Sequence, residues 1–434
     1  MKYYSTNKQA VEASLQEAVV KGLAPDKGLY MPEKIKKLPD SFFEKIDKLT
    51  FPEIAYTVAE SFFGEDIESD ILKDIVSDTL SFDTPLIHIH DNIYSLELFH
   101  GPTLAFKDVG ARFMARLLAY FIRKQGQKDV KVLVATSGDT GSAVANGFLG
   151  VEGIQVYVLY PKGKVSDIQE CQFTTLGQNI IAIEIDGTFD DCQAIVKNAF
   201  MDEELNRKLN LTSANSINIA RFLPQAFYYF HAYAQLKRMG KAREIVVSVP
   251  SGNFGNLTAG LIAKRMGLPV KRFIAANNRN DIFYEYLQTG EYKPRPSVQT
   301  IANAMDVGDP SNFARILDLY NHSWESVKAD ISGSWYKDED IKKTIVDTFG
   351  ETGYLLDPHG ACGYQALKDS LSEGETGIFL ETAHPAKFRE TIESLFGIAI
   401  EIPLPLQEFM KGEKKNISLS KDFEDFRMLL LTGK

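Results

Sequence analysis

One lysine lies where an amine can become reactive. Lys107 follows the turn His100-Gly101-Pro102-Thr103 and the apolar residues 104–106, and an apolar helix is expected after it. Burial and a nearby cation lower the pKa of a lysine, and the neutral amine is a nucleophile that can form a Schiff base with a carbonyl cofactor. A surface lysine at a helix start is the commoner case for a lysine chosen at random, so both interpretations stay open.

Two polar loops lie between an apolar run and an expected helix. The first is Pro250-Ser251-Gly252-Asn253-Phe254-Gly255-Asn256. Free N–H groups at a helix start favour anions, and glycines let the backbone approach a phosphate closely. Residues 251–256 are therefore a candidate phosphate cradle, although many strand–helix turns are Gly-rich without binding a ligand. The second loop, Ser137-Gly138-Asp139-Thr140-Gly141, suits a carboxylate or a phosphate, or simply caps a helix.

The histidines indicate a functional site less clearly than Lys107 and the two loops do. His88 and His90 alternate along an expected strand, and without a third ligand nearby we interpret them as structural rather than metal-binding. His359 and His384 lie in loops bounded by proline and glycine, where they either line a site or are ordinary loop residues. The sequence contains no phosphate loop of the Gly-x-x-x-x-Gly-Lys type, no Gly-x-Ser-x-Gly elbow and no His-Glu-x-x-His pair.

The composition limits the possible partners. The 434 residues are 44% hydrophobic and 24% charged, which is typical of a globular protein and excludes a disordered or disulfide-scaffold architecture. The net charge of −10 argues against nucleic acid as the main partner. Cys171, Cys192 and Cys362 form no Cys-x-x-Cys pair, which fits a reducing compartment. With no apolar run near the length of a membrane span and no apolar signal segment, a cytoplasmic protein without a membrane partner is expected.

Alternating strands and helices must position these loops. Strands are expected over 131–135, 154–160, 180–185, 244–249, 270–276 and 377–380, and most are followed by a helical segment. This alternation predicts an α/β fold with a mainly parallel sheet, in which ligands bind beyond the carboxyl ends of the strands. The loops after 135, 249 and 380 all lie at such ends, so one sheet, or two adjacent ones, would bring them together.

The segments outside this alternating part suggest how the chain is divided into regions and domains. Helices are expected over 10–20, 41–49 and 51–63, so residues 1–95 form a helical N-terminal region. Residues 292–354 are predicted to be helices and loops without visible chemistry, and a last helix is expected over 422–431. We expect a smaller α/β domain over 96–225 with the lysine and the 137–141 loop, and a larger one over 226–434 with the phosphate loop.

Taken in order, these segments resemble the pyridoxal-phosphate enzymes of the tryptophan-synthase-β fold type, and within that group the threonine synthase family. Any one segment is weak, but the ordered set runs over nearly the whole chain. The segments are Gly28-Leu29-Tyr30-Met31-Pro32, His100-Gly101-Pro102-Thr103-Leu104-Ala105-Phe106-Lys107-Asp108, Thr136-Ser137-Gly138-Asp139-Thr140-Gly141, Asn215-Ser216-Ile217-Asn218, Pro250-Ser251-Gly252-Asn253-Phe254-Gly255-Asn256, Ala304-Met305-Asp306-Val307 and Thr382-Ala383-His384-Pro385-Ala386-Lys387-Phe388.

The resemblance implies a fold, a cofactor and roles for several residues. It implies two open, mostly parallel sheets with flanking helices, and pyridoxal 5'-phosphate as the cofactor. Lys107 would hold the cofactor aldehyde and act as general base, residues 251–256 would cradle its phosphate, and Thr382 would bond its pyridine nitrogen. Residues 137–141 would receive the substrate carboxylate. Asp139 stands where the broader fold type often has an asparagine on the ring hydroxyl, so it either accepts a hydrogen bond there or points away.

The implied reaction converts O-phospho-L-homoserine and water to L-threonine and phosphate. The substrate's own phosphate needs a second anion site, for which Lys162, Lys164, Ser166, Ser216, Asn218 and Arg221 are candidates. Arg221 would otherwise form an ordinary ion pair on a helix. The alternatives are a related phospholyase or dehydratase that releases a keto acid and ammonia, and a non-catalytic phosphate-binding protein. We expect a monomer or a small homo-oligomer.

Overall fold

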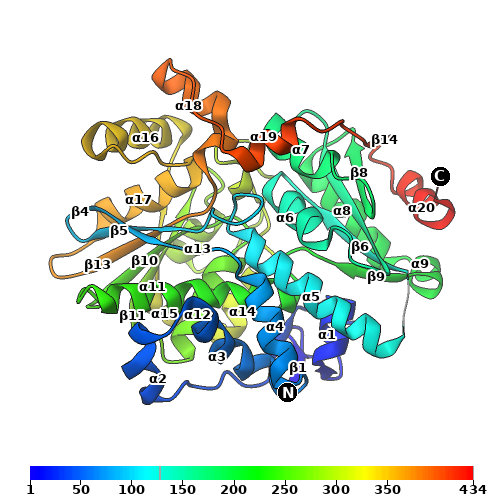
Figure 1. Cartoon of the computed structure of the whole chain (residues 1–434), viewed down its shortest axis with the longest axis horizontal. Helices are drawn as coiled ribbons and strands as arrows, with labels where there is room; N and C mark the ends of the chain where they lie inside the picture. Colours follow the sequence, from blue (N-terminus) through cyan, green and yellow to red (C-terminus); the bar gives the residue numbers. More distant parts are fainter. Residues whose placement is uncertain (127–128, 434) are drawn as a thin grey trace.

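Two parallel β-sheets lie side by side in this protein and are covered by helices (Figure 1). The computed structural model describes residues 1–126 and 129–433, so Lys434, the end of the expected larger domain, lies outside the described residues. The two sheets and their flanking helices confirm the predicted fold class.

The larger sheet has six strands. All neighbours are parallel except the antiparallel pair β4–β5. Every residue of β10 and β13 is buried, as expected for central parallel strands covered on both faces. In spatial order the strands are β12 (Ile331–Trp335), β11 (Val270–Asn277), β10 (Ile245–Pro250), β13 (Thr376–Glu381), β5 (Ile93–Glu97) and β4 (Leu86–His90).

The smaller sheet has five strands, and all of its neighbouring pairs are parallel. Apolar residues of β6, β7 and β8 pack against α8 and α20 in a hydrophobic cluster of their own. In spatial order the strands are β14 (Ile417–Leu419), β8 (Ile180–Ile185), β7 (Ile154–Pro161), β6 (Val130–Ala135) and β9 (Asn210–Ser213).

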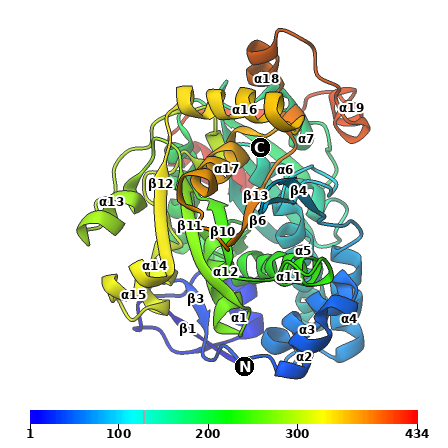
Figure 2. The same ribbon diagram turned by 90° about the vertical axis from the view of Figure 1, so that its left-hand side faces the viewer.

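Helices cover both faces of the larger sheet, with α16 and α17 on one side and α11 and α12 on the other (Figure 2). Among the described residues, no helix is both long enough and apolar enough to cross a membrane. The helices that follow the N-terminal region are α5 (Lys107–Gln125), α6 (Asp139–Phe148), α7 (Asp167–Thr174), α8 (Phe189–Met201), α9 (Glu203–Lys208), α10 (Ile219–Phe222), η2 (Leu223–Gln225), α11 (Ala226–Arg238), α12 (Gly255–Arg265), α13 (Ile282–Thr289), η3 (Asn303–Met305), α14 (Phe313–Leu319), α15 (Trp324–Asp330), α16 (Asp338–Thr352), α17 (Pro358–Ser370), η4 (Pro385–Phe388), α18 (Arg389–Phe396), α19 (Leu404–Met410) and α20 (Phe423–Thr432).

The N-terminal region is mostly helical, but it also contains strands that the sequence did not indicate. Its helices are α1 (Leu15–Lys21), α2 (Asp40–Lys45), η1 (Ile46–Lys48), α3 (Phe51–Phe63) and α4 (Ser69–Thr79). A capping box of Thr50 and Glu53 begins α3 where it was predicted. An antiparallel sheet of β2 (Ala13–Ser14), β1 (Lys2–Ser5) and β3 (Tyr30–Pro32) replaces the first half of the helix expected over 10–20.

Several strands join sheets far from their position in the chain. β5, at the end of the expected N-terminal region, pairs with β13 of the larger sheet, and β4 pairs with β5 at the edge of that sheet. β14, near the C-terminus, completes the edge of the smaller sheet. β12 lies within residues 292–354, where only helices and loops were predicted, and it extends the larger sheet. Each of these strands has at most five residues, so its pairing depends on the tertiary fold more than on a local pattern.

Helix α5 packs so closely on α10 that no side chain fits between them at one point. A Cβ atom on Gly110 would lie 2.4 Å from the Arg221 carbonyl oxygen. We therefore expect Gly110→Ala to lower the free energy of unfolding by about 1–3 kcal/mol, because the two helices would have to separate. Thermal or urea unfolding of the purified variant measures this change.

The matched control is Gly350→Ala. Gly350 is exposed on α16, and a Cβ atom there would meet no other atom within 4 Å. Alanine favours a helix over glycine by about 0.5–1 kcal/mol, so this variant should be at least as stable as the parent chain. Equal stability of the two variants would contradict the close packing of α5 on α10.

Candidate active site

The lysine singled out in the sequence begins α5 and is held there by a short antiparallel contact. Ala105 forms a β-bridge with Ala383, and the Phe106 N–H donates to the Thr382 carbonyl oxygen at 2.8 Å. The turn before it is also fixed, because the buried carboxylate of Asp108 accepts from the N–H and the hydroxyl of Thr103 at 2.9 and 2.6 Å. These contacts bring Lys107 to the carboxyl end of β13.

The surroundings of Lys107 favour the neutral amine. Burial, together with the positive charges of Arg221 and Lys387, lowers the pKa of Lys107 to about 8, although Asp139 acts in the opposite direction. Half-buried at the start of the helix, the amine is thus a base and nucleophile near neutral pH. Of the two interpretations left open by the sequence, the structure favours the reactive lysine over the surface lysine.

The loop at 251–256 connects β10 to α12 and presents free donors. Within the described chain, the backbone N–H groups of Gly252, Asn253 and Phe254 donate to no oxygen. Phe254 adopts a left-handed conformation with φ of 61°, which turns the backbone into the helix start. Consecutive free N–H groups before a helix form an anion-binding nest. The loop therefore has the geometry of the predicted phosphate cradle.

Neighbouring segments hold this loop in place. The Asn253 side chain donates to the Ser216 hydroxyl at 2.8 Å and accepts from the Ser311 N–H at 2.6 Å. The Asn312 amide donates to the Asn253 carbonyl oxygen at 3.0 Å. Gly252 lies directly against the η3 turn, where a Cβ atom would be 2.7 Å from the Ala304 carbonyl oxygen. The cradle is thus rigid before any ligand binds.

The loop at 137–141 connects β6 to α6 and also has free donors. The Thr136 hydroxyl oxygen accepts from the N–H groups of Gly138 and Gly141 at 2.9 and 2.8 Å, which fixes the turn. The N–H groups of Asp139 and Thr140 donate to no atom of the described residues. At the start of a helix these two groups suit a carboxylate, as predicted.

Asp139 itself points away from the free donors of its loop and into a buried ion pair. Its carboxylate accepts from the Lys387 ammonium at 2.6 Å and from the Gln169 amide at 2.9 Å. Burial alone would raise the pKa of Asp139, but the charges of Lys387 and Lys107 hold it well below its usual range. Asp139 is thus a charged hydrogen-bond acceptor within the chain, and its relation to the cofactor ring hydroxyl stays a prediction.

A buried acid–histidine pair supports the η3 turn from the other side. The His359 Nδ1 lies 2.5 Å from Asp357 Oδ1, and the Ala304 N–H donates to His359 Nε2 at 3.2 Å. Because Nε2 accepts, the proton of the ring is on Nδ1. Glu381, at the end of β13, accepts from the Asp357 N–H at 2.5 Å, and burial raises the pKa of Glu381 well above its usual value. His359 therefore positions backbone next to the cradle.

Arg221 is a buried cation with free donors. It is 2% exposed, and its Nε and Nη1 have no partner among the described residues. Burial lowers the pKa of Arg221 to about 10. The ordinary ion pair considered for Arg221 is not formed within the described chain. A buried guanidinium with unpaired donors is costly unless an anion completes it.

Asn218 and Lys164 were predicted to contact the substrate, but in the structure they interact with other groups. Asn218 is fully buried, and its amide donates to the Val19 and Ser213 carbonyl oxygens while its oxygen accepts from the Ala220 N–H. Lys164 is exposed, and its charge acts on Asp191. Both assignments stay predictions, although the hydrogen bonds of Asn218 are already made and Lys164 faces solvent.

The other candidates for binding the substrate phosphate make contacts elsewhere in the protein. The Ser216 hydroxyl accepts from Asn253 and, at 3.2 Å, from Asn312, so it supports the cradle. Lys162 is exposed, with its ammonium 4.0 Å from Glu184. Ser166 caps α7 and donates to the Lys387 carbonyl oxygen at 3.1 Å. Arg221 is therefore the best candidate for the substrate phosphate.

Sequence reasoning missed Lys387 and Gln169 as parts of the site. Lys387 was visible within the segment 382–388, but no role followed from its neighbours in sequence. Gln169 joins Asp139 to Asn303, whose amide donates to the Gln169 side-chain oxygen at 3.3 Å. A lysine among apolar residues was the available indication for Lys387, as it was for Lys107.

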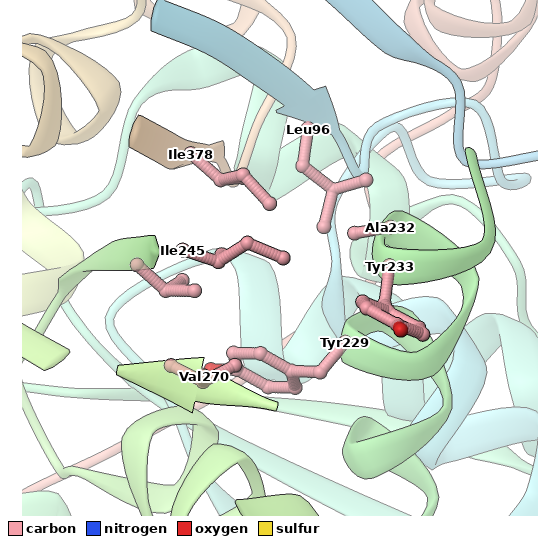
Figure 3. A pocket seen from close by; sticks show the side chains of 8 residues that line it. Leu96, Tyr229, Ala232, Tyr233, Ile245, Val270 and Ile378 are labelled. Carbon is pink, nitrogen blue, oxygen red and sulfur yellow. The ribbon is translucent and has the colours of Figure 1, made fainter. Parts of the chain in front are cut away.

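Two hollows in the described part of the chain lie away from these residues. An apolar cavity of about 10 Å³ lies between α11 and the larger sheet (Figure 3), and it is too small for a substrate. It is lined by Leu96, Tyr229, Ala232, Tyr233, Ile245, Val247, Val270 and Ile378. A hollow of about 580 Å³ beside His231 and Arg238 contains none of the predicted site residues.

The side chains and backbone around Lys107 fit pyridoxal phosphate. The free N–H groups at 252–254 suit its phosphate, and the amine of Lys107 suits its aldehyde. The Thr382 hydroxyl, almost fully buried after β13, makes no hydrogen bond within the described chain and can meet a ring nitrogen. No group of three metal-ligating side chains occurs among the described residues.

Three family models match the chain. The model for pyridoxal-phosphate dependent enzymes matches residues 79–381. The model for the threonine synthase N terminus matches residues 2–80, and the model for the threonine synthase C-terminal part matches residues 360–429.

Known proteins match over the full length. The threonine synthase of Escherichia coli strain K12 is 44% identical over 431 residues, which are 99% of each chain. The crystal structure of threonine synthase from Escherichia coli superposes with a TM-score of 0.94 at 43% identity and covers 100% of both chains. The X-ray structure of pyridoxal-phosphate-bound threonine synthase from Brucella melitensis superposes with a TM-score of 0.91 at 33% identity and covers 99% of this chain and 98% of that one.

We expect Gly252→Ala to weaken the binding of pyridoxal phosphate about tenfold or more, a cost of about 1.4 kcal/mol. The added methyl group would lie 2.8 Å from the Met305 Cα and would displace the loop that carries the free donors. Fluorescence titration of the cofactor-free chain measures the affinity. Gly350→Ala is the control and should bind as the parent does; unchanged affinity of Gly252→Ala would refute the cradle.

Proposed function

This chain belongs to the threonine synthases, a family of pyridoxal-phosphate-dependent lyases, and we propose that Lys107 is the amine on which its chemistry depends. The predicted resemblance and the predicted cofactor are thereby confirmed. The function is the conversion of O-phospho-L-homoserine and water to L-threonine and phosphate. The surroundings of Lys107 support the proposal, because it is half-buried, the residues after β13 pair with the turn before it, and the charge of Asp139, after β6, acts on its amine.

The cofactor would be held by three parts of the chain. Lys107 Nζ would bind its aldehyde covalently, the N–H groups of 252–254 its phosphate, and the Thr382 hydroxyl its pyridine nitrogen. A hydroxyl partner, unlike a carboxylate, does not require that nitrogen to be protonated. When bound, pyridoxal phosphate supplies an electron sink for the carbon that carries the substrate amino group.

Lys107 also moves protons. Once the substrate amine has replaced it, the neutral Nζ would take the proton from the α-carbon and become an ammonium. It would have to return that proton to the bound substrate and cofactor before it could take one from the β-carbon. A base works best when its pKa is near the working pH, and burial brings the pKa of Lys107 to about 8. An exposed lysine, with a pKa of about 10.4, would be protonated at neutral pH almost all of the time.

The substrate would bind between two anion sites. Its carboxylate would accept from the free N–H groups of the 137–141 loop, Ser137 and Thr140 included. Its phosphate would lie on Arg221, whose unpaired guanidinium donors support this assignment. The two sites orient the substrate so that its α-carbon faces Lys107.

The proposal also covers the location, the oligomeric state and the partners of the enzyme. We propose that it acts in the cytoplasm as a monomer or small homo-oligomer, with a small-molecule substrate and without a nucleic-acid or membrane partner. The three cysteines are free thiols, which supports a reducing compartment. We also propose that residues 1–95, 96–225 and 226–434 act as an N-terminal support, a substrate-binding part and a cofactor-binding part, with β4, β5 and β14 crossing between them.

Lys107→Ala should abolish turnover while the fold survives, because the variant lacks both the tether and the base. Phosphate release and threonine formation from O-phospho-L-homoserine measure turnover, and borohydride reduction followed by peptide mapping locates the cofactor on the parent chain. Threonine without ammonia is the expected product, whereas a keto acid with ammonia would indicate the alternative lyase. Cofactor trapped on another lysine would refute the assignment of Lys107.

Arg221→Met should lower kcat/KM for O-phospho-L-homoserine roughly 10- to 100-fold, because a hydrogen bond to a charged group contributes about 1.5–3 kcal/mol. Inorganic phosphate should also inhibit the variant less than it inhibits the parent. Arg123→Met, which changes an exposed arginine at the end of α5, is the matched control and should leave both values unchanged. Parent-like kinetics in Arg221→Met would place the substrate phosphate elsewhere.

A further inference from the structure

Lys387 is completely buried, although lysines are rarely found in protein interiors. Its ammonium donates to Asp139 Oδ1 at 2.6 Å and to the Thr103 carbonyl oxygen at 2.8 Å. It lies on η4, immediately after the segment that pairs with the Lys107 turn. One side chain therefore contacts both the turn that carries Lys107 and the loop that offers the carboxylate site.

The contacts of Lys387 join three parts of the chain. The Thr103 carbonyl oxygen also accepts from the Gln172 amide of α7 at 2.9 Å. Asp139 belongs to α6 and is held by Gln169 of α7 as well. The backbone carbonyl of Lys387 accepts from the Ser166 hydroxyl, so the residue is fixed at both its ends.

The charges around Lys107 form a balanced set. Asp139 from α6 favours its ammonium form, whereas Lys387 from η4 and Arg221 from α10 disfavour it. Asp108, on α5 itself, hydrogen-bonds Thr103, and Tyr228 of α11 donates its hydroxyl proton to the Phe106 carbonyl oxygen. Without Lys387, the carboxylate of Asp139 would have Lys107 as its strongest remaining cationic influence.

We propose that Lys387 is a positioning residue that engages the carboxylate of Asp139 and thereby makes the amine of Lys107 easier to deprotonate. The ion pair neutralises a charge that the 137–141 loop brings close to the amine. The bond from Lys387 to Thr103 also fixes the turn on which Lys107 stands. This inference rests on the proposed role of Lys107 and extends it to the residue that controls its protonation.

The test follows the Lys107 amine directly in the full-length chain freed of cofactor. Acetic anhydride labels neutral amines, and mass spectrometry gives the extent of labelling at Lys107 as a function of pH, with exposed Lys164 as the internal reference. The parent should show a midpoint near 8. Lys387→Met should raise that midpoint by about one pH unit or more, because Asp139 then stabilises the ammonium form of Lys107.

Two further variants keep the test decisive if Lys387→Met does not fold. Asp139→Asn should lower the midpoint below that of the parent, since Lys387 and Arg221 then act unopposed. The double variant Asp139→Asn/Lys387→Met should have a midpoint above that of Asp139→Asn and close to the parent value. Equal midpoints in the single variant Asp139→Asn and the double variant would overturn the proposal, as would a parent-like midpoint in folded Lys387→Met.

A remote pair provides the matched control. Lys264 bonds Asp330 at 2.7 Å between α12 and α15, and Lys264→Met should leave the midpoint of Lys107 unchanged. If Lys264→Met raised the labelling midpoint of Lys107 as far as Lys387→Met does, the shift would be a general effect of losing an ion pair. That result would count against the proposal. Borohydride trapping of the cofactor on another lysine would instead defeat the proposed function, while the labelling result would still report on Lys387.

Discussion

The antiparallel contact between residues 104–106 and 382–384 is the interaction on which the rest of the site depends. It consists of the Ala105–Ala383 bridge, the bond from Phe106 N–H to Thr382, and the bond from His384 N–H to the Leu104 carbonyl oxygen at 3.1 Å. Through it, the end of β13 determines where Lys107 begins α5. The same few residues place the Thr382 hydroxyl and, one turn later, Lys387. A small shift in this contact would move Lys107, Thr382 and Lys387 together.

Two buried arginines differ in how their hydrogen bonds are satisfied. Arg315 is fully buried, but its guanidinium donates to the carbonyl oxygens of Tyr30, Ser216 and Ile217 and lies 3.9 Å from the ring centre of Phe222. It thus fastens the N-terminal strand β3 to the loop beside the cradle. Arg221 is buried to a similar extent, yet its Nε and Nη1 have no partner in the described part of the chain. Unsatisfied hydrogen bonding, rather than charge alone, distinguishes a residue that awaits an anion.

Local patterns in the sequence predicted much of the fold. The strand β8 and the helix α3 have the predicted bounds, because continuous apolar runs, capping residues and glycines act within a few positions. The two Gly-rich loops and Lys107 could also be singled out locally. The pairing of Asp139 with Lys387, the bonds that occupy Asn218, and the short strands β1, β12 and β14 could not. Each depends on a partner distant in sequence, and a single sequence contains no signal of such proximity.

The edge of the smaller sheet is closed by the last part of the chain. β14 pairs with β8, and Phe426, Leu429 and Leu430 of α20 pack into the cluster formed by the strands β6, β7 and β8 (Figure 1). During synthesis, an open strand edge and an apolar patch therefore persist until β14 and α20 have left the ribosome. Such edges template pairing between chains, so the nascent protein is vulnerable to aggregation until these two elements pack on the smaller sheet. The order of synthesis thus makes β14 and α20 the elements that close this sheet.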